Sequence, residues 1–159
     1  MPIRSFGPVD EKVAEADFFL ERLSECGRDF FAARCFTAAF VGSTRSVTYA
    51  VQASLAHQEG FAEWYRKRQA ELQNDPTCRF FHQFRRFNHH LGHNFLSAAV
   101  SVDGGRAAFF FGSTKDIPEV AQVPREDVQT ACTLYMIRIV SLVFACYEHF
   151  GPVVDAHRY

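Results

Sequence analysis

The chain has 159 residues, which is the usual size of one domain and enough to bury a substantial core. Its 17 Lys and Arg residues nearly balance its 18 Asp and Glu residues, which excludes a uniformly basic nucleic-acid coat protein. The five cysteines form no C-x-x-C pair and are expected to be reduced thiols, and no hydrophobic run of signal-peptide length opens the chain. We therefore expect a single domain over residues 1–159, located in the cytoplasm and not in a membrane.

Three amphipathic helices are predicted in the first half of the chain, where apolar residues recur at three- and four-residue spacing. The first is expected to begin at Asp10, which can act as its N-cap, and to end at Gly27. The second, over about residues 29–57, is rich in small side chains that allow another helix to approach closely. The third follows Gly60 and is expected to run to about residue 73.

A fourth helix and a hairpin are predicted next. Asp75 is a favourable N-cap and Pro76 suits the first helical position, so the helix is expected to start there and to end at Gly92. Residues 95–112 contain two apolar runs on either side of an Asp-Gly-Gly turn, which predicts a small β-hairpin insert. Residues 116–123 are expected to form a loop.

The last predicted helix begins at Pro124 and runs to about Phe150, where Gly151 and Pro152 are expected to end it. Much of it is apolar nearly all round, which is typical of a helix buried among several neighbours, and the run is slightly short for a membrane span. The whole pattern predicts an all-α fold, an antiparallel bundle of about five helices with the hairpin inserted before the last one. The 18 phenylalanines point to a tightly packed core and are compatible with a buried subunit interface.

The fourth predicted helix concentrates cations, imidazoles and aromatic rings. No Asp or Glu occurs from residue 76 to residue 102, so these cations have no local counter-ion and would attract an anion, phosphate in particular. At about 100° per residue, two stripes form on the helix. One stripe contains His82, Arg86, His89 and His93, and the other contains Phe80, Phe84, Phe87 and Leu91.

Three interpretations of this helix compete. The first is an ordinary solvated cationic face, and the second is a metal site formed by His82, His89 and His93. The metal site is disfavoured because no carboxylate accompanies the histidines and Arg86 would repel a dication, so neither metal nor cofactor is expected. The third is acid/base chemistry on a phosphodiester, in which imidazole transfers protons and guanidinium stabilises the anionic transition state.

Arg85 and His90, separated by four residues, resemble the Arg-x4-6-His signature of the HEPN (higher eukaryotes and prokaryotes nucleotide-binding) family, and Gly92 follows shortly after. The order of the predicted helices is similar to the family layout as well. The resemblance implies a helical bundle, commonly a homodimer, whose active members are metal-independent endoribonucleases and often toxins. It also implies that Arg85 binds the scissile phosphate and that His90 acts as the acid/base.

The expected ligand is therefore RNA or a nucleotide, and the expected partners are a second copy of the chain and an antitoxin or a nucleotidyltransferase. With Arg85 and His90 as catalytic residues, the substrate contacts are expected from Arg86, His89, His93 and His82. The alternative is a non-catalytic HEPN-like interaction or regulatory protein that binds a nucleotide or a protein through the same face. On an ideal helix Arg85 and His90 diverge by about 140°, so either the last turn opens before Gly92 or a partner chain completes the cleft.

Five residues outside this helix have two interpretations each. Arg138, inside the most apolar helix, is expected to be a buried ion-pair partner that holds the bundle in register, with a second cation of the site as the alternative. Arg34 and Arg45 are expected to be surface or helix-end charges, although both could line a cleft. Tyr135 and Trp64 are expected in the core, with base stacking as the alternative.

Overall fold

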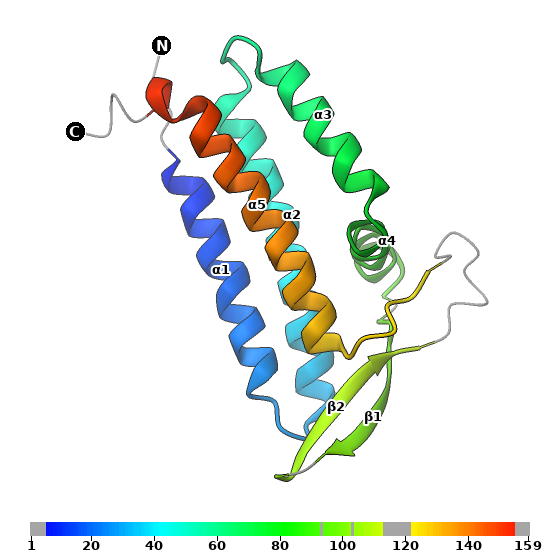
Figure 1. Ribbon diagram of the computed structural model, residues 1–159. Coiled ribbons are helices and arrows are strands. Elements are labelled where there is room, and N and C mark those ends of the chain that lie inside the picture. The colour runs from blue at the N-terminus through cyan, green and yellow to red at the C-terminus, as the bar shows by residue number, and fades with distance from the viewer. Residues whose placement is uncertain (1–5, 93, 103, 113–121, 155–159) are drawn as a thin grey trace.

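A computed structural model shows a mostly helical protein and describes residues 6–92, 94–102, 104–112 and 122–154 (Figure 1). Its helices and strands follow one another in the predicted order. They are α1 (Gly7–Ser24), α2 (Phe30–Leu55), α3 (Phe61–Asn74), α4 (Pro76–Leu91), β1 (Leu96–Val102), β2 (Arg106–Phe111) and α5 (Val128–Val154). The prediction of a helical fold with a small hairpin before the last helix is therefore confirmed.

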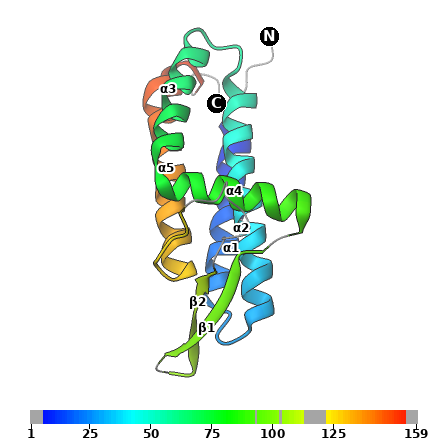
Figure 2. The same cartoon turned by 90° about the vertical axis from the view of Figure 1, so that its right-hand side faces the viewer.

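The helices do not all lie parallel or antiparallel to one another. Helices α1, α2, α3 and α5 run along the length of the molecule, whereas α4 is seen almost end-on in Figure 1 and lengthwise in Figure 2. Helix α4 thus lies across the other helices, and only one residue, Asp75, separates it from α3. The expectation of an antiparallel bundle is wrong for α4, because this single-residue corner turns the chain instead of reversing it.

Side-chain caps set the start of two helices, at the predicted N-cap Asp75 and also at Asp29, where the second helix is expected to begin. Asp29 Oδ1 accepts a hydrogen bond from the Ala32 N–H at 2.9 Å, and Asp75 Oδ1 accepts one from the Cys78 N–H at 3.1 Å. Gly92 follows the last residue of α4 with a φ of 69°, a left-handed conformation that favours glycine. The predicted limits of α4 are therefore confirmed.

The limits of α1 and α5 differ from the prediction. Helix α1 begins at Gly7, because Pro8 already has the backbone geometry of a first helical turn. Helix α5 begins at Val128 and not at Pro124, because Asp127 Oδ1 accepts the Thr130 N–H at 3.0 Å and caps the helix there. The helix also continues past Pro152, which removes only its own N–H from the last turn.

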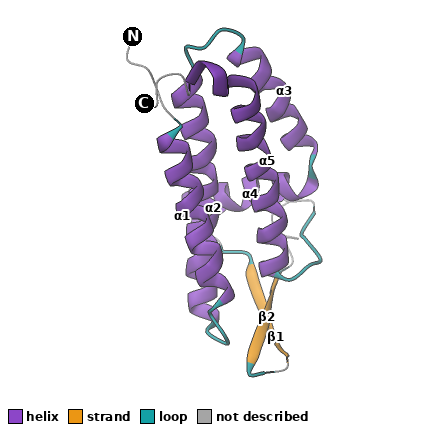
Figure 3. Ribbon diagram, turned by 60° about the vertical axis from the view of Figure 1, so that its left-hand side comes forward, coloured by secondary structure: helices purple, strands orange, loops and turns teal. Residues whose placement is uncertain are grey.

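The hairpin forms a two-stranded antiparallel sheet at one end of the molecule (Figure 3). Gly104 and Gly105 make the turn, both with positive φ, and the register shifts between Leu96 and Ala98. The Ala107 N–H donates to the Gly27 carbonyl at 3.0 Å, which ties β2 to the segment between α1 and α2.

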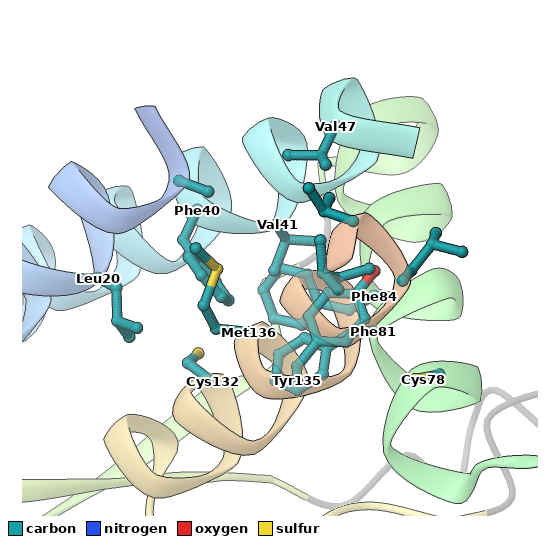
Figure 4. Packing of buried hydrophobic residues seen from close by; sticks show 14 of the residues in the cluster. Leu20, Phe40, Val41, Val47, Cys78, Phe81, Phe84, Cys132, Tyr135 and Met136 are labelled. Carbon is teal, nitrogen blue, oxygen red and sulfur yellow. The ribbon is translucent and has the colours of Figure 1, made fainter. Parts of the chain in front are cut away.

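Aromatic side chains of α4 pack into the hydrophobic core together with residues of α1, α2 and α5 (Figure 4). The ring of Phe81 stacks on Tyr135 of α5 with centroids 4.7 Å apart and planes 9° apart, and both side chains are buried. The ring centroids of Phe80 and of Phe111 in β2 are 4.8 Å apart. These contacts hold α4 against both α5 and the sheet, so the opposite side of α4 stays available.

Helix α5 is long and apolar enough over Val128–Pro152 to cross a membrane, by length and composition alone. Of its most apolar window, 44% is buried inside the protein, whereas Leu134, Ile137 and Phe144 are exposed. A core helix of a soluble protein meets the same criterion, so the expected absence from membranes and the cytoplasmic location remain predictions.

Candidate functional site

A pocket of about 380 Å³ lies where α4 crosses the other helices, and we call it the cationic pocket. Helices α2, α3, α4 and α5 all contribute to its wall. The lining residues that matter most for its chemistry are Arg45 of α2, Tyr65 of α3, Arg79, His82 and Arg85 of α4, and Tyr135 of α5. No Asp or Glu is among the described lining residues, so the pocket is positively charged.

The sequence of α4 places its cations in this pocket. Arg79, His82 and Arg85 follow one another at three-residue intervals, which puts neighbouring side chains on adjacent positions of the helix surface. Phe81 and Phe84 between them are fully buried and fix the rotation of α4 about its axis. Burial of the aromatic side of α4 therefore turns its cationic side toward the pocket.

Arg45 enters the pocket from α2, forty positions earlier in the chain than Arg85. Its guanidinium lies over the ring of Tyr49 at 4.3 Å, and its Nη1 donates a long hydrogen bond of 3.4 Å to Thr48 Oγ1. These contacts hold the guanidinium in place without neutralising its charge. The expectation that Arg45 is a surface or helix-end charge is wrong, whereas Arg34 of the same helix does not line the pocket.

Several polar atoms at the pocket have no partner in the described part of the chain. Nε of Arg45, Nε of Arg85 and Oε1 of Gln83 are all buried and make no hydrogen bond there. Nor does Arg45, Arg79 or Arg85 form an ion pair with any described carboxylate. Buried polar groups are usually hydrogen-bonded, so this concentration of unpartnered donors and acceptors indicates a site that a ligand would complete.

The pocket changes the pKa of several lining residues, and the change at His82 matters most for chemistry near neutral pH. The pKa of His82 lies below its ordinary value, first because the ring loses hydration against the pocket wall, and then because Arg45, Arg85 and Arg86 are nearby. His82 is therefore neutral near pH 7 and can accept a proton. Burial raises the pKa of Tyr135 to about 12, so this phenol stays protonated.

The structure brings together only part of the predicted site. Arg85, which is half-buried, and His82, which is exposed, both line the cationic pocket, whereas the exposed residues Arg86, His89 and His90 do not line it. The remaining predicted ligand contact, His93, lies outside the described residues.

The last turn of α4 does not open before Gly92. The helix is regular through Leu91, and the Gly92 N–H donates to the Asn88 carbonyl at 3.1 Å. The expectation that an opened last turn would bring Arg85 and His90 together is therefore wrong. The remaining route, a partner chain that completes the cleft, stays a prediction.

Sequence reasoning missed the contribution of α3 to the pocket. Tyr65, Gln69 and Gln73 recur at four-residue spacing and all line it, which is the signal that could have identified this wall. The Tyr65 hydroxyl accepts a hydrogen bond from Gln52 Nε2 at 3.1 Å, and burial raises its pKa. Trp64 lies outside the pocket and contacts Phe150 at the other end of α3.

The structure also shows the positions of Arg138 and Tyr135, for which the sequence left two interpretations each. Arg138 Nε donates to Asp75 Oδ2 at 2.9 Å, so it pairs α5 with the start of α4 and is not a cation of the pocket, although its side chain is 56% exposed and not buried. Tyr135 is a core residue whose ring also forms part of the pocket wall.

Among the described residues, no group of three or more His, Cys, Asp or Glu side chains is arranged to hold a metal ion. Comparison with known proteins finds no matching family model, no matching curated protein and no matching solved structure. The chemistry of the cationic pocket must therefore be argued from its own residues.

Proposed function

We propose that this protein binds a nucleotide and that the cationic pocket receives its phosphate group. One observation carries the proposal: the guanidinium groups of Arg45 and Arg85 reach the same pocket with buried, unpartnered Nε atoms, and no described carboxylate lines it. Arg79 and His82 add to this cluster. A phosphate would supply the hydrogen-bond acceptors and the negative charge that the protein itself does not provide.

The energetics favour an anionic ligand over an empty pocket. Guanidinium groups that crowd one hollow repel one another and lose part of their hydration, which destabilises the protein without a ligand. Hydrogen bonds to charged groups contribute about 1.5–3 kcal/mol each. A phosphate bound by Arg45 and Arg85 would therefore reverse an unfavourable arrangement and gain affinity from two contacts.

The rest of the pocket suits the nucleoside part of such a ligand. The largely buried rings of Tyr65, Phe81 and Tyr135 make part of the wall apolar, as a base requires, and the unpartnered Gln83 Oε1 can accept a hydrogen bond from it. The volume of about 380 Å³ is within the range of about 300–1,000 Å³ typical of small-molecule sites. The combination of cations, aromatic rings and amides favours a nucleotide over inorganic phosphate alone.

The HEPN-like endoribonuclease remains the second proposal, and its support is the spacing of Arg85 and His90. Within one chain Arg85 lines the cationic pocket and His90 does not, so cleavage would require a second chain to bring an imidazole to Arg85. The expected homodimer and the antitoxin or nucleotidyltransferase partner belong to this proposal. Cleavage of RNA in the presence of EDTA, lost in both Arg85→Ala and His90→Ala, would favour the nuclease.

Binding of the four ribonucleoside 5′-monophosphates, measured by isothermal titration calorimetry, tests the nucleotide proposal. We expect Arg45→Gln and Arg85→Gln each to weaken binding at least about tenfold, because each removes a charged donor from the phosphate. Arg86→Gln is the matched control, since it removes the same charge from an exposed residue of α4 that does not line the pocket. Absence of binding by the wild-type protein, or an equal loss in Arg86→Gln, would contradict the proposal.

A further inference from the structure

We infer that the cationic pocket takes a terminal phosphomonoester rather than an internal phosphodiester, and that His82 takes up a proton when this group binds. The inference rests on the proposed nucleotide binding and adds the class of phosphate and the way in which pH controls it. Three features of the described residues carry it: the small size of the pocket, the number of its cations and the identity of its titrating group.

The pocket is walled on several sides. Residues of four helices line it: Val41 and Arg45 of α2, Tyr65 of α3, Arg79 and Arg85 of α4, and Ile139 of α5. An internal phosphodiester continues into a sugar on both sides and needs two exits for the polynucleotide. A terminal phosphomonoester needs only one. The volume, near the lower end of the range of about 300–1,000 Å³ for ligand sites, leaves room for one small ligand.

The charge of the pocket matches a doubly charged phosphate. Arg45, Arg79 and Arg85 supply three permanent positive charges, and no described carboxylate of the lining offsets them. An internal phosphodiester brings one negative charge, whereas a phosphomonoester brings about −1.5 to −2 at pH 7. The phosphomonoester therefore neutralises more of the mutual repulsion among these guanidinium groups than a diester can.

The groups that share the pocket with His82 do not change their own charge between pH 7 and 8. The guanidinium groups of Arg45, Arg79 and Arg85 in the pocket, and that of Arg86 outside it, are permanent positive charges. Burial raises the pKa of Tyr65 of α3, of Cys78 of α4 to about 12 and of Tyr135 of α5 to about 12, so these groups stay neutral. Among the described lining residues, His82 is thus the group that can titrate.

The direction of the pH effect follows from the surroundings of His82. Without a bound anion its imidazole is neutral at pH 7, because the lost hydration and then the nearby guanidinium charges oppose protonation. A bound dianion offsets those charges and favours the protonated ring. One proton then moves from the solvent to a ring nitrogen of His82, no covalent bond to the ligand forms, and affinity rises as the pH falls from 8 to 7.

Calorimetry with matched ligands tests this inference. The nucleoside 5′-monophosphate that binds most tightly is compared with its phosphate methyl ester, which keeps the base and the sugar and removes one charge. Each titration is carried out at pH 7 and pH 8 in two buffers of different ionisation enthalpy, which reports the protons taken up. We expect the monophosphate to bind at least about tenfold more tightly than the ester and to take up part of a proton at pH 7.

His82→Gln keeps a polar side chain that cannot be protonated in this range, and it should abolish proton uptake and the pH dependence, so that binding is weakened more at pH 7 than at pH 8. His89→Gln, an exposed residue of the same helix outside the pocket, should leave both unchanged. Equal affinity for the ester, or proton uptake that persists in His82→Gln, would overturn the inference while nucleotide binding stands. Failure of every monophosphate to bind would overturn the proposed function as well.

Discussion

The charges of α3 and those of α4 are arranged in opposite ways, although the two helices adjoin in the chain. On α3, Lys67 pairs with Glu63 at 3.4 Å and Arg68 pairs with Glu71 at 3.1 Å, all at helical spacing and all facing solvent. On α4, no cation has a carboxylate partner among the described residues. Two neighbouring helices of one fold thus differ in whether their charges are balanced internally.

The difference indicates two roles: the paired charges of α3 keep that helix soluble, whereas the unpaired cations of α4 are available to bind an anionic ligand. Exposed pairs like those of α3 contribute roughly 0–1 kcal/mol each and are screened by salt. The cations of α4 gain no such pairing, and the helix holds its position through the aromatic residues on its other side. Changes to the aromatic side should therefore affect stability, and changes to the cationic side should affect binding.

The largest expected loss of stability comes from the aromatic side. Phe81→Ala removes a fully buried ring that stacks on Tyr135, and we expect the free energy of unfolding to fall by about 3–5 kcal/mol in urea denaturation. Leu91→Ala is the control, because Leu91 is an apolar residue of the same helix that is 65% exposed and should change stability by less than about 0.5 kcal/mol. A similar loss in both variants would mean that α4 is not anchored through its aromatic side.

A smaller effect is expected at the start of α4, where a carboxylate does meet a cation. Asp75→Ala removes both the cap of α4 and the ion pair to Arg138, and should lower the free energy of unfolding by about 1–2 kcal/mol. Asp75→Asn keeps an oxygen that can cap and should lose less, because the Arg138 side chain is 56% exposed and its pair contributes at most about 1 kcal/mol. Equal losses in the two variants would show that the charge matters more than the cap.

The smallest effect is expected on α3. Lys67→Ala breaks the solvent-exposed pair with Glu63 and should change the free energy of unfolding by about 0.2–0.5 kcal/mol. Nucleotide affinity measured by calorimetry should stay the same, since Lys67 does not line the cationic pocket. Loss of affinity comparable to that in Arg85→Gln would remove the distinction between the charges of the two helices.

Local signals in the sequence were sufficient for most of the fold. Asp29, Asp75 and Gly92 mark helix limits because capping depends on neighbouring residues alone, and the Asp-Gly-Gly turn marks the hairpin for the same reason. The crosswise direction of α4 has no such local signal. Besides the corner at Asp75, it depends on how Phe81 packs against Tyr135 of α5, a contact between residues more than fifty positions apart.

The candidate site was predictable only where it lies on one helix. Arg85 and His82 stand out because the segment around them has no carboxylate, a feature visible in the sequence itself. Arg45 and Tyr65 come from helices whose relation to α4 only the tertiary structure shows. The pairing of Arg85 with His90 fails within one chain because α4 stays regular to its end, as the geometry of an unbroken helix requires.

The corner formed by Asp75 has a consequence for how a ligand would meet this protein. Because only Asp75 joins α3 to α4, the angle between these two walls of the cationic pocket is fixed before a ligand binds. Little loop entropy would then be lost on association, and shape selection would operate at the first encounter. Inserting a few glycines at that corner should therefore reduce the difference in affinity among ligands, while the melting temperature changes little.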